Sequence, residues 1–380
     1  MDKKLALFVP VTCGTAFFLG LELGGFQLIL LQAANFFNLN NVMMGAMVTS
    51  QFTAITLGPL LFGWAADRYG KKTILLISLP LFMLGCFGAA FSGTVYIFMI
   101  SVFVTGLGYS VTECISSSAL SDSFPGRESN YINLMQCGFC LGAVISPQIF
   151  SRLIASGLVS WRAVFLCAGS GFVLFFPLLC LSHCKRPVPA NNDSTSASGV
   201  NARIISPMLF ILLAGMTAYV AIESGVSFFA DAIFVTEYSN TVLGAYAISA
   251  FWLAMTCARL VFAIIRINMR KAVILGFAAT TVLLLLMFLI KDQWIQLGII
   301  TLLGAALGPI WTMIVGIGTT SFREKSATVA SILYAAGGIG GVVTPLLIGW
   351  VSEWAGFYGG VRLLAAVSLI GLLAMWFGRR

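Results

Sequence analysis

The sequence predicts an all-α membrane protein in which twelve transmembrane helices form two pseudo-symmetric six-helix bundles. Three observations support this fold class: the apolar composition, the spacing of the apolar segments and an internal repeat. Of the 380 residues, 59% are hydrophobic and only 9% are charged, whereas a soluble domain carries roughly a quarter charged residues. So little polar surface could not shield a core of this size from water, so the surrounding solvent must be lipid.

Apolar stretches long enough to cross a bilayer alternate with polar or Gly/Pro-marked turns. They predict twelve spans, near residues 5–36, 42–65, 73–92, 95–121, 130–153, 161–182, 207–236, 240–265, 272–290, 294–320, 327–351 and 358–378. One long polar stretch, 183–206, cannot bury enough apolar surface to fold and is predicted to be a flexible cytoplasmic linker. The expected units are therefore an N-terminal bundle (1–182), this linker and a C-terminal bundle (207–380).

The basic residues predict the orientation of the chain. If the N-terminus is cytoplasmic, all but four of the 21 lysines and arginines fall on the cytoplasmic side, as the positive-inside rule requires. The four exceptions are Arg152, Arg162, Lys291 and Arg362. We therefore expect a multi-pass protein of the cell inner membrane with both termini in the cytoplasm.

The two halves of the sequence repeat one another. Phe124 and Pro147 in the first half recur as Phe322 and Pro345, each 198 positions later, and both prolines follow a glycine-containing apolar stretch. A parallel repeat of two bundles places a binding site near the midplane between them.

A motif follows the second span, in the segment that begins with Gly63 and Trp64 and ends with Lys71 and Lys72. It resembles the G-x-x-x-D-R-x-G-R/K-K/R signature of the major facilitator superfamily, and it stands in the cytoplasmic loop where that family carries it. The resemblance implies the major facilitator fold and transport by alternating access. It also implies a cytoplasmic gating role for the motif residues, with the basic side chains in water; these are Gly63, Asp67, Arg68, Gly70, Lys71 and Lys72.

Within that superfamily, four short stretches are similar to the fucose:proton symporter type of sugar transporter. They are Gly106 to Glu113, Asn133 to Ala143, Tyr219 to Glu223, and Gly308 to Pro345. The aspartate expected in the first span is absent, and Glu22 is the only acid there. The resemblance implies proton-coupled uptake of a small polar solute such as a sugar, and a central cavity lined by spans 1, 4, 7 and 10.

Acidic residues inside spans are costly and are therefore functional candidates. Glu22, Glu113, Glu223 and Asp231 are candidates for proton coupling or substrate binding. Glu22 and Glu223 are separated by nearly the repeat offset, so we expect them to face each other across the pseudo-twofold axis. An apolar cavity favours the neutral form of a carboxyl, which lets it load and release a proton. A proton is the preferred coupling ion, and sodium is the alternative. A purely structural role is the other alternative for each acid, through a buried hydrogen bond or a pairing with Arg259.

Amides and aromatic rings on the cavity spans are the natural partners of a polar ligand. The candidate substrate-binding residues are Gln27, Tyr109, Asn133, Gln136, Phe228 and Trp311. Trp311 aligns with Glu113 at the repeat offset, which places it in the same expected cavity.

Other functions are weighed against this one. A drug or metabolite:proton antiporter of the same superfamily is the alternative, and a non-transporting membrane sensor is the alternative of another class. An enzyme is excluded because the one histidine, His183, lies at a membrane edge, away from every candidate nucleophile. No cofactor, metal site or nucleic-acid partner is expected. The partners are the solute, the coupling ion and the lipid bilayer, and we expect the chain to function as a monomer.

Overall fold

The computed structural model describes residues 3–124, 128–182, 206–264, 268–321 and 326–377. These residues form eleven continuous helices, which are α1 (Lys3–Phe36), α2 (Asn41–Tyr69), α3 (Lys71–Ala90), α4 (Val95–Ser123), α5 (Glu128–Ala155), α6 (Ala163–Leu181), α7 (Pro207–Tyr238), α8 (Thr241–Ile264), α9 (Met269–Leu289), α10 (Gln293–Ser321) and α11 (Ser326–Phe377). Each contains an apolar stretch long enough to cross a membrane. In lipid, a helix satisfies its own backbone polar groups, which is why such stretches fold this way.

The helix α11 contains two spans. Its backbone is broken only at Gly356, whose φ of 66° and ψ of 175° are not helical. Glycine adopts positive φ without steric cost, so the chain turns there and re-enters the membrane almost without a loop. Twelve spans therefore arise from eleven continuous helices, and the predicted loop between residues 351 and 358 is replaced by this turn.

Large apolar side chains cover the outer surface. Leu84, Leu174 and Leu275 are all more than 60% exposed. Exposed leucine at many positions indicates a lipid-facing surface rather than a water-facing one.

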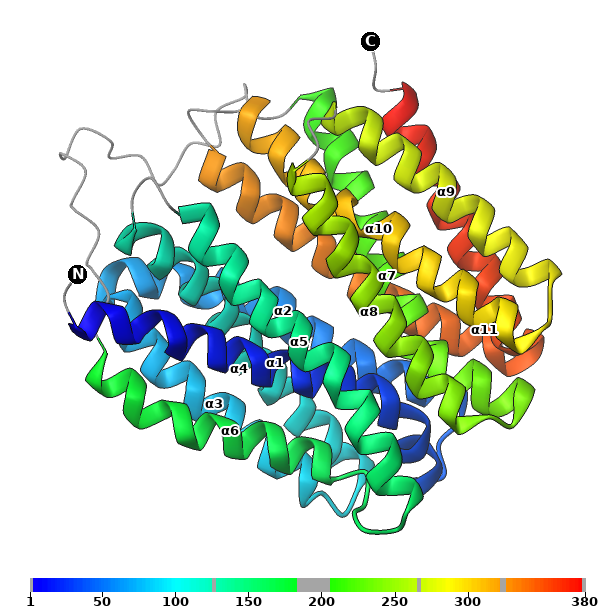
Figure 1. Cartoon of the computed structure of the whole chain (residues 1–380), viewed down its shortest axis with the longest axis horizontal. Coiled ribbons are helices and arrows are strands. Elements are labelled where there is room, and N and C mark those ends of the chain that lie inside the picture. The colour runs from blue at the N-terminus through cyan, green and yellow to red at the C-terminus, as the bar shows by residue number, and fades with distance from the viewer. Residues whose placement is uncertain (1–2, 125–127, 183–205, 265–267, 322–325, 378–380) are drawn as a thin grey trace.

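The helices α1 to α6 pack together as one bundle, and α7 to α11 as a second (Figure 1). One end of both bundles, here called the terminal end, holds Lys3, Leu181, Pro207 and Phe377. The opposite end, here called the distal end, holds the turns that follow α1 and α7. Within the first bundle, α1 and α5 approach so closely that Gly20 and Gly142 leave no space for a Cβ. Small residues at such contacts allow helix backbones to pack tightly in lipid.

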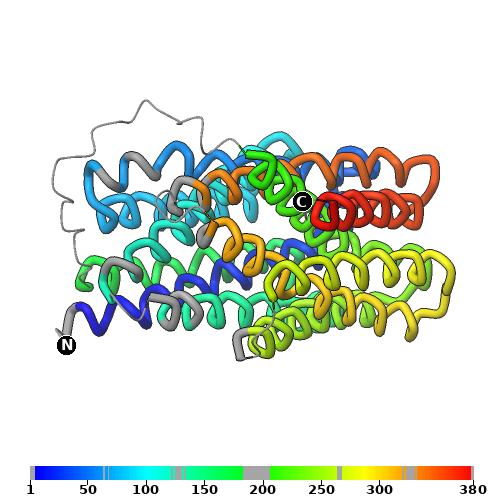
Figure 2. Tube along the Cα trace, turned by 90° about the horizontal axis from the view of Figure 1, so that it is seen from above, coloured from blue at the N-terminus to red at the C-terminus, as the bar shows by residue number. Residues whose placement is uncertain are grey.

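Two helix pairs join the bundles. The first pair is α2 and α11, which run side by side (Figure 2). They meet at Gly45 of α2 and Gly349 of α11, and each glycine lies directly against the backbone of the other helix. The second is α5 with α8, where Gln148 Nε2 donates to Ser249 Oγ at 3.0 Å and Ser249 Oγ donates to the carbonyl of Val144 at 2.8 Å. These pairs are equivalent under the sequence repeat, in which α2 corresponds to α8 and α5 to α11.

A further contact at the distal end involves Glu353 of α11. Its Oε1 accepts hydrogen bonds from the backbone N–H groups of Asn41 and Val42, the first two residues of α2. The unsatisfied amides at a helix N-terminus favour an anion. Glu353 therefore caps a helix of the other bundle and ties the distal ends of the two bundles together.

Candidate functional site

The carboxylate of Glu22 lies fully buried inside the first bundle. Gln51 of α2, also fully buried, donates from Nε2 to both carboxylate oxygens of Glu22 at 3.0 Å. Gln51 Oε1 has no hydrogen-bond partner. A protonated Glu22 could donate to this oxygen once the amide turns, so the pair accommodates a neutral carboxyl as well as an ionised one. Glu22 is thus bonded within its own bundle.

A second carboxylate–amide pair lies between α4 and α5. Gln136 Nε2 donates to Glu113 Oε1 at 3.1 Å, and both side chains are half-buried. The structure therefore brings together two residues that the sequence named separately. Asn133, the third candidate in this region, has a side chain outside the described residues.

The carboxylate of Glu223 has a different environment, built on a cation. The hydroxyl of Tyr219, one turn earlier on α7, donates to Glu223 Oε1 at 2.8 Å. Arg259 Nη2 of α8 donates to the same hydroxyl at 3.2 Å and lies 4.0 Å from Glu223 Oε1. Arg259 Nε also donates to the carbonyl of Gly308 in α10, at 3.2 Å. We call Tyr219, Glu223 and Arg259 the arginine cluster; it links three helices of the second bundle.

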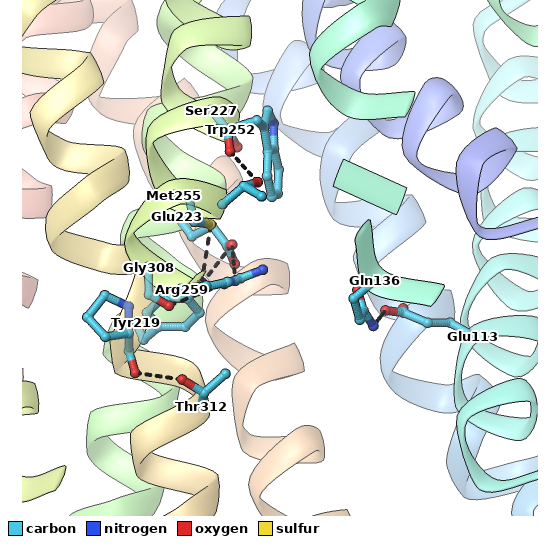
Figure 3. A network of polar contacts seen from close by, with 12 residues as sticks. Glu113, Gln136, Tyr219, Glu223, Ser227, Trp252, Met255, Arg259, Gly308 and Thr312 are labelled. Atoms are coloured by element: carbon cyan, nitrogen blue, oxygen red, sulfur yellow. Dashed lines mark hydrogen bonds and ion pairs between the residues drawn. The ribbon is translucent and has the colours of Figure 1, made fainter. Parts of the chain in front are cut away.

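Figure 3 shows how these groups lie with respect to one another. The Glu113–Gln136 pair stands on the first bundle, and Arg259 points toward it from the second. Arg259 carries the charge opposite to that of an ionised Glu113. Two acids and one arginine, held on facing bundles, can contact the hydroxyl and ether oxygens of a polar solute from both sides.

Gln27 of α1 connects the bundles beside these clusters. Its Nε2 donates to Ser227 Oγ of α7 at 3.1 Å, and its Oε1 accepts from Trp252 Nε1 of α8 at 2.9 Å. All three side chains are buried. By position along α7, this bridge lies four residues nearer the distal end than Glu223.

The aromatic candidates lie mainly in packing contacts. Phe228 is 1% exposed and packs edge-on against Phe26 and Phe52 of the first bundle, so it belongs to the contact between bundles. Tyr109 packs against Phe139 within the first bundle. Trp311 lies 5.8 Å from the ring of Tyr219, centroid to centroid, which places it against the arginine cluster.

The signature motif between α2 and α3 is anchored inside the first bundle. Gly70 has a φ of 95°, which explains a glycine between two helices with no intervening loop. Lys72 Nζ donates to the carbonyls of Cys180 and Ser182 at the end of α6. The surroundings of Gly63 and the side chain of Asp67 lie outside what the structure describes, and Arg68 is exposed.

Lys71 corrects the expectation that the basic residues of the motif stay in water. This side chain is 8% exposed, and its Nζ donates to the hydroxyl and carbonyl oxygens of Ser118 in α4. The correction follows from position, because Lys71 is the first residue of α3 and its stem lies against the last turns of α4.

The sequence raised a pairing of an acid with Arg259 only as the structural alternative to proton coupling, and it counted this arginine as an orientation charge. The packing of α7, α8 and α10 shows that its partner is Glu223. Sequence reasoning missed Trp252 and Gln51, and no sequence pattern distinguishes them from other tryptophans and glutamines in spans.

Comparison with known proteins places the chain in a family. A sequence model of the Major Facilitator Superfamily matches residues 12–266, more than half of the chain. The chain therefore belongs to the Major Facilitator Superfamily, and it is a multi-pass membrane transporter rather than an enzyme. The superfamily assignment made from the motif is confirmed, while the comparisons do not extend to the fucose:proton symporter type.

Individual relatives are distant. A protein TsgA homolog of Buchnera aphidicola subsp. Schizaphis graminum is 22% identical over 336 residues, which cover 86% of this chain and 84% of the relative. The structure resembles a bacterial homolog of the human lysosomal transporter Spinster in an inward-facing and occupied conformation (TM-score 0.77, 13% identity, 99% of this chain and 96% of the other). It also resembles the nucleoside transporter NupG (TM-score 0.75, 14% identity, 98% and 100%). At such identities the structural likeness shows the fold alone.

Proposed function

We propose that this chain is a proton-coupled symporter of the cell inner membrane that takes up a small polar solute of sugar-like chemistry by alternating access. One observation carries the proposal: the Glu113–Gln136 pair and the arginine cluster lie on facing bundles, with Glu113 near the middle of α4 and Glu223 near the middle of α7. A solute between them would contact a carboxyl that can take up a proton and an arginine that keeps its charge.

The contacts between bundles support a conformation that is closed at the distal end. Between described residues, the hydrogen bonds that join the bundles extend from Asn41 and Glu353 to Gln27 and Trp252, and both central clusters lie on the terminal side of them. With the termini and the linker 183–206 in the cytoplasm, this is the inward-facing state. Rocking of the two bundles about the central site would then expose it to the other side.

The test measures proton movement in proteoliposomes that contain the purified chain. A panel of sugars, nucleosides and other small polar metabolites is added outside, and external pH is followed. We expect one solute class to alkalinise the medium, because solute and proton enter together. Glu113→Gln should abolish this signal, since an amide cannot carry the proton. Glu237→Gln, which neutralises an exposed acid on α7, is the matched control and should retain it.

The antiporter alternative predicts a different result. Lipophilic cations added to acid-loaded vesicles would release protons, and no sugar or nucleoside would move them. That result would overturn the symporter proposal. Replacing the sodium of all solutions by potassium distinguishes the coupling ions, because a sodium symporter would lose uptake and a proton symporter would not.

A further inference from the structure

A pocket lies at the distal end between the two bundles, separate from the central clusters. Its volume is about 290 Å³, and its walls come from α1 and α5 of the first bundle and from α7 and α8 of the second. Its polar lining residues are Gln32, Asn35, Gln148, Ser151, Arg152, Asp231, Thr241 and Tyr246. The Gln27 bridge lies between this pocket and the arginine cluster, because Ser227 falls between Glu223 and Asp231 on α7. Pockets for small molecules begin near 300 Å³, so the ligand must be small.

Asp231 is the most unusual group in this pocket. Its side chain is 3% exposed, and no described residue forms a hydrogen bond or an ion pair with its carboxylate. A Cβ on Gly244 would overlap Asp231 Oδ1, so the glycine gives the carboxylate its space. Burying a carboxylate without a partner is expensive. Such a group takes up a proton, or it meets a positively charged or hydrogen-donating ligand in the pocket.

Arg152 supplies the opposite charge to the same pocket. It is exposed at the distal end of α5, and its Nη2 lies 3.4 Å from the hydroxyl of Tyr246. Arg152 and Asp231 line one cavity without forming an ion pair with each other. Two opposite charges that face one cavity from different bundles match a ligand that carries both charges itself, because each end then meets its complement.

We propose that this distal pocket binds a small zwitterion, with its ammonium group at Asp231 and its carboxylate at Arg152. The amides of Gln32, Asn35 and Gln148 are available to polar atoms between the two charged ends. Because both bundles form the walls, the ligand binds the distal-closed arrangement and stabilises it. The proposal needs neither proton coupling nor transport through the central site.

The experiment measures binding to the purified full chain in detergent, by calorimetry and by the midpoint of thermal unfolding. The probes are glycine, β-alanine, 4-aminobutyrate and 5-aminopentanoate, which differ only in the separation of their charges. Propylamine and butyrate carry one charge each. We expect one zwitterion to bind best and to raise the midpoint, with both single-charge probes at least tenfold weaker.

Variants assign the two ends of the ligand. Asp231→Asn and Arg152→Gln should each weaken the best zwitterion at least tenfold. Asp231→Asn removes a buried charge and is expected to fold; Gly244→Ala, which keeps the charge but displaces Oδ1, provides a second route to the same loss. Lys291→Gln, a change outside the pocket, is the control and should bind as the wild type does.

Three results would overturn the proposal. They are no binding by any zwitterion, equal binding by propylamine, which would make this a simple cation site, or unchanged binding in Asp231→Asn. Glu113→Gln should bind the zwitterion normally. Loss of proton coupling in that variant therefore tests the central site alone, and the two proposals can fail separately.

Discussion

The acids of the two bundles differ in their partners. In the first bundle, Glu22 and Glu113 each accept a hydrogen bond from a glutamine amide. In the second, Glu223 faces Arg259 and the Tyr219 hydroxyl. A neutral amide tolerates both the ionised and the protonated carboxyl, since it can donate to one and accept from the other. An arginine stabilises only the ionised form. Under the proposed function, we therefore expect Glu113 to load the proton and Arg259 to supply a fixed charge.

Among the tests of this difference, we expect Arg259→Gln to have the largest effect. The substitution leaves Glu223 without its cation and also removes the bond to the carbonyl of Gly308. Breaking a partly buried ion pair on one side costs about 3–5 kcal/mol, so we expect initial uptake of the solute to fall by roughly a hundredfold or more. Arg259→Lys should not restore it, because an ammonium cannot bond Tyr219 and Gly308 in the same geometry. Uptake above a tenth of wild type in the glutamine variant would contradict a fixed-charge role.

The second test compares Glu113→Gln with Glu223→Gln in solute counterflow, which needs binding and rocking but no net proton movement. Counterflow by Glu113→Gln should stay within about threefold of the wild-type rate. Gln136 can still form a hydrogen bond with the new amide, and the expected loss of free energy is about that of one hydrogen bond in a membrane protein. Glu223→Gln should lose most of it, since Arg259 is left with an uncompensated charge. Equal loss of counterflow in the two variants would contradict the difference between Glu113 and Glu223.

A smaller effect is expected from Gln27→Leu, at the bridge that joins the two regions. The variant loses the bonds to Ser227 and Trp252, each worth about 0.6 kcal/mol in a membrane protein. The population of the distal-closed arrangement, relative to the open one, should therefore fall roughly eightfold. Hydrogen exchange should rise in the facing segments 41–52 and 340–352. Thr301→Val, which removes only a bond within α10, is the control and should leave exchange there unchanged.

Much of the fold was accessible from the sequence because lipid imposes a simple rule on helix length. The apolar stretches predicted the spans, and two predicted loops became tight turns, one at Gly70 and one at Gly356. The candidate site was accessible only in part. Glu113 and Gln136 were named because each is costly or polar in a span, but their pairing depends on how α4 and α5 are rotated. The expected facing of Glu22 and Glu223 remains a prediction, and each is bonded within its own bundle.

Arg259 shows why the remainder could not be predicted. A basic residue near the end of a span serves orientation in most membrane proteins, and nothing in the sequence gives the direction of its side chain. The rotation of α8 against α7 decides whether the guanidinium reaches water or Glu223. That rotation is set by packing over the whole helix, which no short motif encodes.

The contact of Glu353 with the first residues of α2 has a consequence for how this protein can vary. One side of the contact is a side chain, and the other is backbone N–H, which every residue except proline possesses. Substitutions at Asn41 or Val42 therefore leave the bond intact, whereas a single change at position 353 removes it. This contribution to distal closure can thus be adjusted at one position of the second bundle, while positions 41 and 42 of the first bundle vary without affecting it.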